Sequence, residues 1–163
     1  MSLTIRRATP ADAAVVADFN ARLARETEGK DLDPAVLRAG VGAVLADPQK
    51  GFYTLAERAG EVVGQVLVTY EWTDWRNGWY WWVQSVYVRP DARRGGVFGR
   101  LYRHLEAAAL ADPTVVGLRL YVEQDNHAAQ AVYRRLGLAD EPYFLMGRYP
   151  LPGRGDRPGT PAG

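Results

Sequence analysis

The fold is decided by residues 86–105, which read VYVRPDARRGGVFGRLYRHL. This stretch predicts an apolar strand ended by Pro90, then a basic glycine-rich turn, then an amphipathic helix. The first turn of a helix offers backbone N–H groups without acceptors and the positive end of the helix dipole, so this order is typical of a phosphate-binding site. Arg93 and Arg94 add positive charge. Three glycines allow a ligand to approach the backbone closely, because they carry no Cβ: Gly95, Gly96 and Gly99.

The turn lacks the residues that define two other nucleotide-binding loops. A Walker loop needs Lys followed by Ser or Thr, and a dinucleotide fingerprint needs Gly-x-Gly-x-x-Gly. The segment instead resembles the acyl-CoA-binding motif of the GNAT N-acetyltransferases, Gln/Arg-x-x-Gly-x-Gly/Ala. Arg93 and Gly96 match that motif, whereas Phe98 replaces a small residue. The alternative is a polar turn that only caps a helix.

The resemblance implies that this loop holds the pyrophosphate of acetyl-CoA through backbone N–H groups of residues 94–99, with the Phe98 ring pointing away from the ligand. The loop residues expected to contact the cofactor are Arg93, Arg94, Gly95, Gly96, Val97, Phe98 and Gly99.

Length and composition favour one globular domain, residues 1–149, followed by a Pro/Gly-rich tail, residues 150–163, without fixed structure. The net charge of +1 argues against broad binding to nucleic acid or an anionic membrane. The absence of cysteine excludes a disulfide framework, a protein thiol nucleophile and a Cys-ligated zinc site. We expect no metal, no signal peptide and a cytoplasmic location.

Strand-like and helix-like segments alternate along the chain. The predicted strands cover residues 2–7, 53–58, 62–70, 79–89, 115–122 and 143–149, and the predicted helices cover residues 9–25, 34–46, 97–111 and 126–136. The apolar strand 115–122 suggests burial on both faces. This order defines an α/β (α+β) layer fold with a mixed central sheet.

The same order is similar to the GNAT fold over nearly the whole chain up to the tail. In that fold the strand ending at Val88 and the strand containing residues 118–122 run parallel and splay apart. The resemblance implies that acyl-CoA enters this wedge and that its pantetheine pairs with the backbone edge of Val86, Tyr87 and Val88.

A second motif, LRLYVEQDNHAAQAVYRRLGL at residues 118–138, resembles the family's strand, asparagine and helix ending in Tyr-x-x-Leu-Gly-Phe, with Leu138 in place of Phe. Asn126 and Tyr133 are separated by about two helical turns, roughly 10 Å along the axis, so both could line one extended ligand. The resemblance implies that Asn126 binds the pantetheine and that Tyr133 lies near the sulfur. A phenol with an ordinary pKa of about 10 can serve as the general acid. The alternatives are an N-cap and a core tyrosine.

The general base is less defined. Many relatives carry a Glu on the strand before Pro90, but Trp82 or Gln84 stands near that place here. A water chain to Glu71 or to Glu26 is our preferred route, and Asp74 and Glu28 are further candidates. The alternative interpretation of each carboxylate is a solvated surface group with no catalytic role.

All five tryptophans fall between residues 72 and 82. Strand alternation places Trp79 and Trp81 on one face and Tyr80 and Trp82 on the other. Hairpin packing accounts for most of the cluster, and an aromatic wall for an organic ammonium is the functional alternative. The expected substrate-binding residues are Glu26, Glu28, Trp75, Trp82 and Gln84.

The leading hypothesis is an acetyl-CoA-dependent N-acetyltransferase that transfers the acetyl group directly to an amine, with Tyr133 and Glu71 as catalytic residues. The acceptor is a small amine, with a protein N-terminus or lysine as alternatives. A non-catalytic acyl-CoA sensor or interaction module is the competing hypothesis, and nucleic-acid binding is a third. The resemblance also allows a homodimer. The sequence does not identify the acceptor, the acyl chain length or the oligomeric state.

Overall fold

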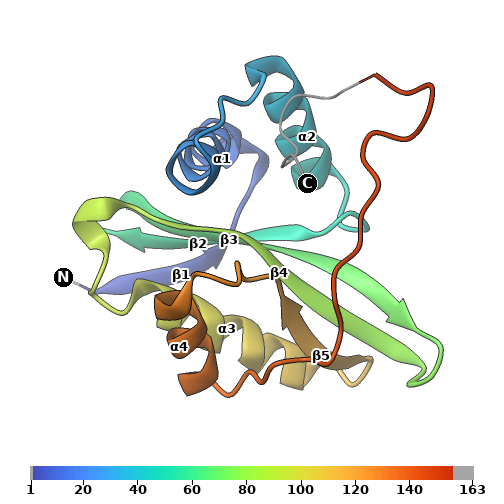
Figure 1. The fold of residues 1–163 in the computed structure, drawn as a ribbon. Helices are drawn as coiled ribbons and strands as arrows, with labels where there is room; N and C mark the ends of the chain where they lie inside the picture. The colour runs from blue at the N-terminus through green and yellow to red at the C-terminus, as the bar shows by residue number, and fades with distance from the viewer. Residues whose placement is uncertain (1, 156–163) are drawn as a thin grey trace.

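The computed structural model describes residues 2–155, which form a mixed sheet with helices on both faces (Figure 1). The strands of this sheet are β1 (Leu3–Arg7), β2 (Phe52–Arg58), β3 (Glu61–Thr73), β4 (Gly78–Val88) and β5 (Val115–Leu120), in the spatial order β1-β2-β3-β4-β5. Neighbouring strands are antiparallel except β4 and β5, which are parallel. The mixed α/β class predicted from the sequence is therefore confirmed.

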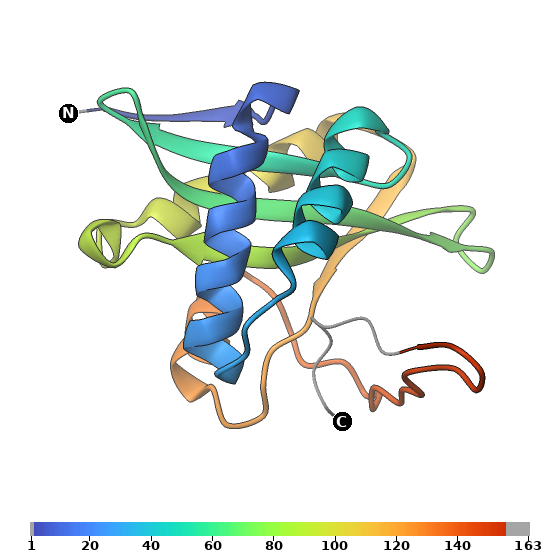
Figure 2. The same cartoon turned by 90° about the horizontal axis from the view of Figure 1, so that it is seen from above.

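Helices lie on both faces of the sheet. On one face lie α1 (Ala13–Glu28) and α2 (Pro34–Ala46), and on the other lies α3 (Val97–Ala111), with α4 (His127–Arg135) beside it past the edge of β4 (Figures 1 and 2). Short 3₁₀ turns, Pro10–Asp12 and Pro90–Ala92, precede α1 and α3. The start of α2 is fixed by Asp33, whose carboxylate accepts hydrogen bonds from the N–H groups of Ala35 and Val36.

The two sheet faces carry separate apolar clusters. On the α3 side, Leu101 and Leu105 pack with Val66 and Val68 of β3. On the α1 and α2 side, Val16 and Val41 pack with Leu55 of β2 and Leu67 of β3. The sheet is thus covered by helices on both faces, and its strands alternate between the two clusters.

The parallel strands separate before β4 ends. β4 pairs with β5 only from Trp79 to Val83, so its last five residues lack a β5 partner. A bulge lies just beyond this point, because Gln84 is opposite Leu67 whereas Tyr87 is opposite Gln65. Ser85, in the bulge, has a φ of 49°. A bulge of this kind bends the strand and increases its twist, and the expected splay is confirmed.

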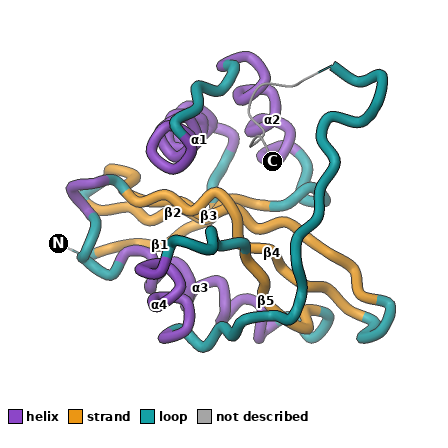
Figure 3. Tube along the Cα trace, in the orientation of Figure 1, coloured by secondary structure: helices purple, strands orange, loops and turns teal. Residues whose placement is uncertain are grey.

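The strand predicted over residues 143–149 is wrong. These residues form a loop that leaves the sheet after α4 (Figure 3). The apolar pattern is present, but a strand also needs a hydrogen-bonded neighbour, and within the described chain β5 pairs only with β4. For the same reason β5 is an edge strand, and Val116 is 40% exposed rather than buried on both faces.

The start of the predicted tail, residues 150–155, contains neither helix nor strand, and the rest of that prediction lies outside the described residues. Among residues 2–155, no helix combines the length and apolarity that a membrane crossing requires.

Candidate active site

The glycine-rich turn ends in a helix N-terminus without a side-chain cap. Gly96 is the N-cap residue of α3, with a φ of 71°, and no side chain accepts a hydrogen bond there. The first helical bond runs from the Arg100 N–H to the Gly96 carbonyl oxygen at 3.1 Å. The N–H groups of Val97, Phe98 and Gly99 precede that bond and therefore have no acceptor within the helix. The turn thus offers unpaired backbone donors that can bind an anionic group such as a phosphate.

Arg93 joins the turn to the end of β4 and to α1. Its Nε donates to the Val88 carbonyl oxygen at 2.9 Å, and its Nη2 pairs with the Glu26 carboxylate at 2.5 Å. The guanidinium also lies over the Tyr87 ring, 5.6 Å from its centroid, and the Tyr87 hydroxyl donates to Glu26 at 3.2 Å. Burial, followed by the nearby Glu26 charge, raises the pKa of Tyr87. The turn and the β4 edge are therefore held side by side.

Tyr133 lies on α4 beside the turn. Its ring makes an edge contact with the Phe98 ring at 5.6 Å, and Phe98 also contacts Tyr102 at 6.2 Å. Phe98 thus points toward α4. Burial raises the pKa of the Tyr133 phenol, so the hydroxyl is protonated at neutral pH.

Asn126 is the N-cap residue of α4. Its side-chain oxygen accepts a hydrogen bond from the Ala129 N–H at 3.1 Å. The cap uses the amide oxygen and not the amide NH₂ group, so a donor remains on the same side chain.

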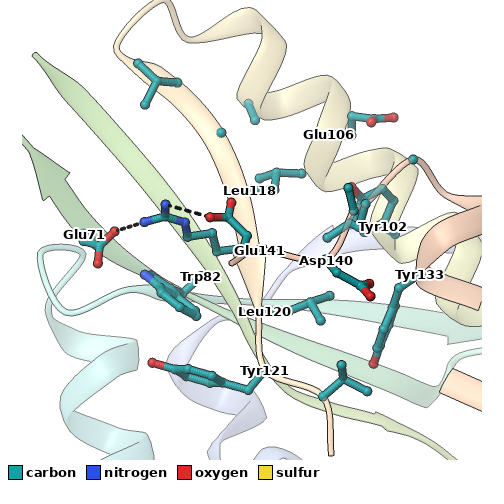
Figure 4. A pocket seen from close by; sticks show the side chains of 18 of the residues that line it. Glu71, Trp82, Tyr102, Glu106, Leu118, Leu120, Tyr121, Tyr133, Asp140 and Glu141 are labelled. Atoms are coloured by element: carbon teal, nitrogen blue, oxygen red, sulfur yellow. Dashed lines mark hydrogen bonds and ion pairs between the residues drawn. The ribbon is translucent and has the colours of Figure 1, made fainter. Parts of the chain in front are cut away.

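A groove of about 1280 Å³ wraps around the free edge of β5. Its lining includes Glu71 and Trp82 together with Tyr133, so it reaches both faces of the sheet. Figure 4 shows Glu71 and Trp82 on one side of β5 and Tyr133 on the other. The predicted acid, Tyr133, and the predicted base, Glu71, thus border this groove from opposite sides of β5.

Arg119 organises the polar side of this groove. It pairs with Glu71 at 2.7 Å and with Glu141 at 3.3 Å, and it lies 3.7 Å from the centroid of the Tyr80 ring (Figure 4). Trp82 stacks on Tyr121, with ring centroids 4.4 Å apart. The result is a charged triad beside an aromatic pair.

The structure separates the predicted substrate-binding residues. Trp82 lines the groove, and Gln84, on the same face of β4, donates a hydrogen bond to the Thr69 hydroxyl. Trp75 lies in the β3–β4 turn and is 86% exposed. Glu26 is paired with Arg93, and Glu28 lies 3.7 Å from Lys30 at the end of α1. Of these five residues, only Trp82 lines the groove, and Gln84 lies near it on the same face of β4.

The tryptophan cluster divides between the faces as predicted. Trp79 packs edge-on against Trp72 and Tyr70, and Trp81 packs against Phe52 on the α3 side. Packing within the β3–β4 hairpin and against Phe52 accounts for these rings, whereas Trp82 lines the groove.

Comparison with known proteins identifies the family. Residues 17–138 match the model of the acetyltransferase (GNAT) family. The chain belongs to this family. Among curated relatives, the mycothiol acetyltransferase of Streptomyces avermitilis is 38% identical over 157 residues, which cover 90% of this chain and 46% of that protein. The mycothiol acetyltransferase of Streptomyces griseus is 37% identical over 156 residues, with the same coverages. The chain thus spans about half the length of these relatives.

Solved structures agree with the GNAT assignment. A possible acetyltransferase from Clostridium difficile 630 has a TM-score of 0.86 and 42% sequence identity, covering 93% of this chain and 99% of that chain. A "predicted acetyltransferase with acetyl-CoA" from Clostridium acetobutylicum shares the fold, with a TM-score of 0.74 at 16% identity over 90% of this chain and 96% of that chain.

The sequence did not single out two residues that line the groove, Arg119 and Tyr121, or Ser85 in the bulge of β4. The signal for Arg119 was its position as the one charged residue in the apolar stretch 115–122. Tyr121 follows β5 directly, and nothing local marked its contact with Trp82. Within residues 2–155, no group of three His, Cys, Asp or Glu side chains could hold a metal ion.

Proposed function

We propose that this GNAT protein is an acetyl-CoA-dependent N-acetyltransferase that transfers the acetyl group directly to the amine of a small molecule. The observation that carries the proposal is the contact between Arg93 and Val88, because it joins an uncapped helix N-terminus to an unpaired strand edge. One site can thus take a diphosphate and the extended arm attached to it.

In this proposal the cofactor is held by the turn and by the β4 edge. The N–H groups of Val97, Phe98 and Gly99 bind the diphosphate, with Arg94 supplying charge, and Val86 and Val88 pair with the pantetheine. The Asn126 amide NH₂ binds the same arm. Acetyl-CoA supplies the thioester, which is the activated acetyl group.

The protein's own groups would move the protons. Tyr133 donates a proton to the departing thiolate, a role that its raised pKa supports, since the phenol stays protonated until well above neutral pH. The Val86 N–H, next to the bulge, stabilises the negative charge that develops on the carbonyl oxygen. These steps use no metal ion.

The acceptor amine would enter beside Trp82 and Glu71. An alkylammonium must lose a proton before its nitrogen can attack, and we assign Glu71 as the base, acting through water. Both Glu71 and Glu26 are ion-paired, with Arg119 and Arg93 respectively, and Glu71 is preferred because it borders the groove beside Trp82, where the acceptor is proposed to enter. The curated relatives' name supports a small-molecule acceptor.

We also propose that the protein is cytoplasmic, because it would use acetyl-CoA. We propose no nucleic-acid partner. Many arginines are already paired with carboxylates, which leaves less cationic surface for phosphates: Arg6, Arg25, Arg89, Arg93, Arg119 and Arg134.

The test is release of free CoA thiol from acetyl-CoA in the presence of amino sugars, polyamines, amino acids and peptide N-termini. We expect turnover with small amines. Tyr133→Phe should lower kcat at least about 10-fold with little change in the Kd for CoA, because the hydroxyl acts only in transfer. Unchanged turnover would remove the acid assignment. CoA binding without turnover across the whole panel would favour the acyl-CoA sensor instead.

A further inference from the structure

The Tyr133 hydroxyl has no hydrogen-bond partner among residues 2–155. A general acid must reach the atom that it protonates within hydrogen-bond distance. Since no hydrogen bond within the described chain directs this hydroxyl, its position depends on the packing of the ring that carries it. The contacts of the Tyr133 ring therefore decide where its proton can be delivered.

The helix that carries Tyr133 offers little packing of its own. No residue of α4 is buried. The helix is capped by Asn126 at its start, and just beyond its end the exposed pair of Arg134 and Asp140 joins it to the following loop. The contact that fixes the Tyr133 ring must therefore come from another element.

Phe98, in the first turn of α3, supplies this contact. The Phe98 and Tyr133 rings meet edge-on, with centroids 5.6 Å apart and an angle of 73° between the ring planes. Edge-to-face packing is a preferred geometry for two aromatic rings and restricts how each ring can turn. In residues 2–155, Phe98 is the aromatic neighbour of Tyr133.

Phe98 is itself held from behind by Tyr102. The two residues are four positions apart and so lie on one face of α3, with ring centroids 6.2 Å apart. Tyr102 is only 3% exposed, so its own position is fixed by the core. A row of three rings thus runs from the buried side of α3 to Tyr133.

We propose that Phe98 is a positioning residue, whose ring holds the Tyr133 hydroxyl toward the thioester sulfur. The inference rests on the proposed function, in which Tyr133 is the general acid. Phe98 stands where the resembling motif has a small residue, and its backbone N–H still lies in the uncapped first turn of α3. The backbone of Phe98 thus serves the diphosphate while its side chain serves the acid.

These two roles can be separated, because a side-chain substitution leaves the backbone N–H in place. Phe98→Ala should lower kcat about 3- to 10-fold and change the Kd for CoA less than about 2-fold. Trp72→Ala is the matched control, because it removes an edge contact with Trp79 at the same angle of 73°, in the β3–β4 hairpin. It should leave kcat unchanged. A Phe98→Ala variant with wild-type kcat would overturn the proposal.

A double-mutant cycle separates positioning from a general structural role. In the Tyr133→Phe background there is no hydroxyl to position, so Phe98→Ala should lower the residual kcat less than about 2-fold. Equal losses in the two backgrounds would show that Phe98 acts on the fold and not through Tyr133, and would overturn the proposal.

A titration gives a readout that does not need turnover. Burial raises the pKa of the Tyr133 phenol, and removal of the Phe98 ring should expose the phenol, so its pKa should fall toward about 10. NMR of ¹³C-labelled tyrosine measures this fall, with the Tyr133 signal assigned from the Tyr133→Phe variant. An unchanged titration in Phe98→Ala would overturn the proposal, whether or not the protein acetylates any amine of the panel.

Discussion

Gln65 donates a hydrogen bond from its side-chain nitrogen to the Ser85 carbonyl oxygen, 3.2 Å away, at the bulge where β4 leaves β5. The same nitrogen donates to the Asn20 side-chain oxygen at 2.7 Å, and Asn20 donates to the Tyr53 hydroxyl at 3.1 Å. Gln65 is fully buried. A buried chain from α1 through β3 thus holds the backbone of the strand edge that the proposed cofactor uses.

Gln65→Met should reduce stability and weaken cofactor binding together. The substitution keeps the length of the side chain but leaves Asn20 and the Ser85 carbonyl without their donor, at a cost of about 1–3 kcal/mol in the free energy of unfolding. We also expect a several-fold higher Kd for CoA, measured by calorimetry at a temperature where the variant is folded. Gln84→Met, which removes a half-buried bond to Thr69, is the matched control. Equal Kd values for the two variants would contradict a positioning role for Gln65.

Gly96→Ala should weaken CoA binding more than it weakens folding. Gly96 has a φ of 71° and no atom within 4 Å of an added Cβ, so the folding cost is conformational, about 1 kcal/mol. Relaxation of that strain would move the N–H groups of the turn and raise the Kd for CoA about 5-fold or more. Gly29→Ala carries the same strain at the end of α1, with a φ of 64° and open space. It should show a similar loss of stability with an unchanged Kd.

Asp12 makes the stability of the N-terminal region depend on pH. Hydrogen bonds from Arg6, at 2.9 Å, are the main cause that lowers the pKa of Asp12 to about 2. Because the folded pKa lies below the unfolded value, the stabilisation is complete above about pH 4 and is lost as the pH falls toward 2. We expect Asp12→Asn to lower the free energy of unfolding by about 1 kcal/mol at pH 7.

Urea titrations at pH 7 and near pH 2.5 check the Asp12 prediction, because the difference between wild type and variant should shrink at the lower pH. A difference that is constant with pH would show that the charge on Asp12 is not the cause.

Trp82→Leu should raise the KM for the acceptor and leave the KM for acetyl-CoA nearly unchanged. The substitution removes the stacked contact with Tyr121, a contact worth about 0.5–1.5 kcal/mol, and opens the wall beside Glu71. The expected change in acceptor KM is about 3- to 10-fold. Trp75→Leu is the matched control, because that ring lies in the exposed hairpin turn. Equal effects of the two variants would contradict the placement of the acceptor beside Trp82.

Local sequence patterns predicted much of the fold because those patterns report local physics. The turn before β4 was marked by Asn77-Gly78, and α3 by its glycine turn and apolar stripe. The parallel pair β4 and β5 came from the family resemblance, since nothing within either strand specifies its neighbour.

The features that the sequence did not predict correctly depend on contacts between residues far apart in the chain. Residues 143–149 have a strand composition, but composition does not say where a hydrogen-bonding partner lies. The Arg119–Glu71 pair joins residues 48 positions apart, and the bulge at Ser85 depends on its register with β3. Asn126 was predicted to bind the pantetheine, with an N-cap role as the alternative. The structure shows the N-cap hydrogen bond to the amide oxygen, and this bond does not use the amide NH₂ group.

Backbone hydrogen–deuterium exchange with and without CoA tests the central claim most directly, because the proposed contacts are mainly backbone N–H groups. The account predicts slower exchange at residues 94–100 and 84–88 when CoA is bound, with little change in β1 and α2. CoA binding without protection of the glycine-rich turn would contradict the account, even for an active enzyme.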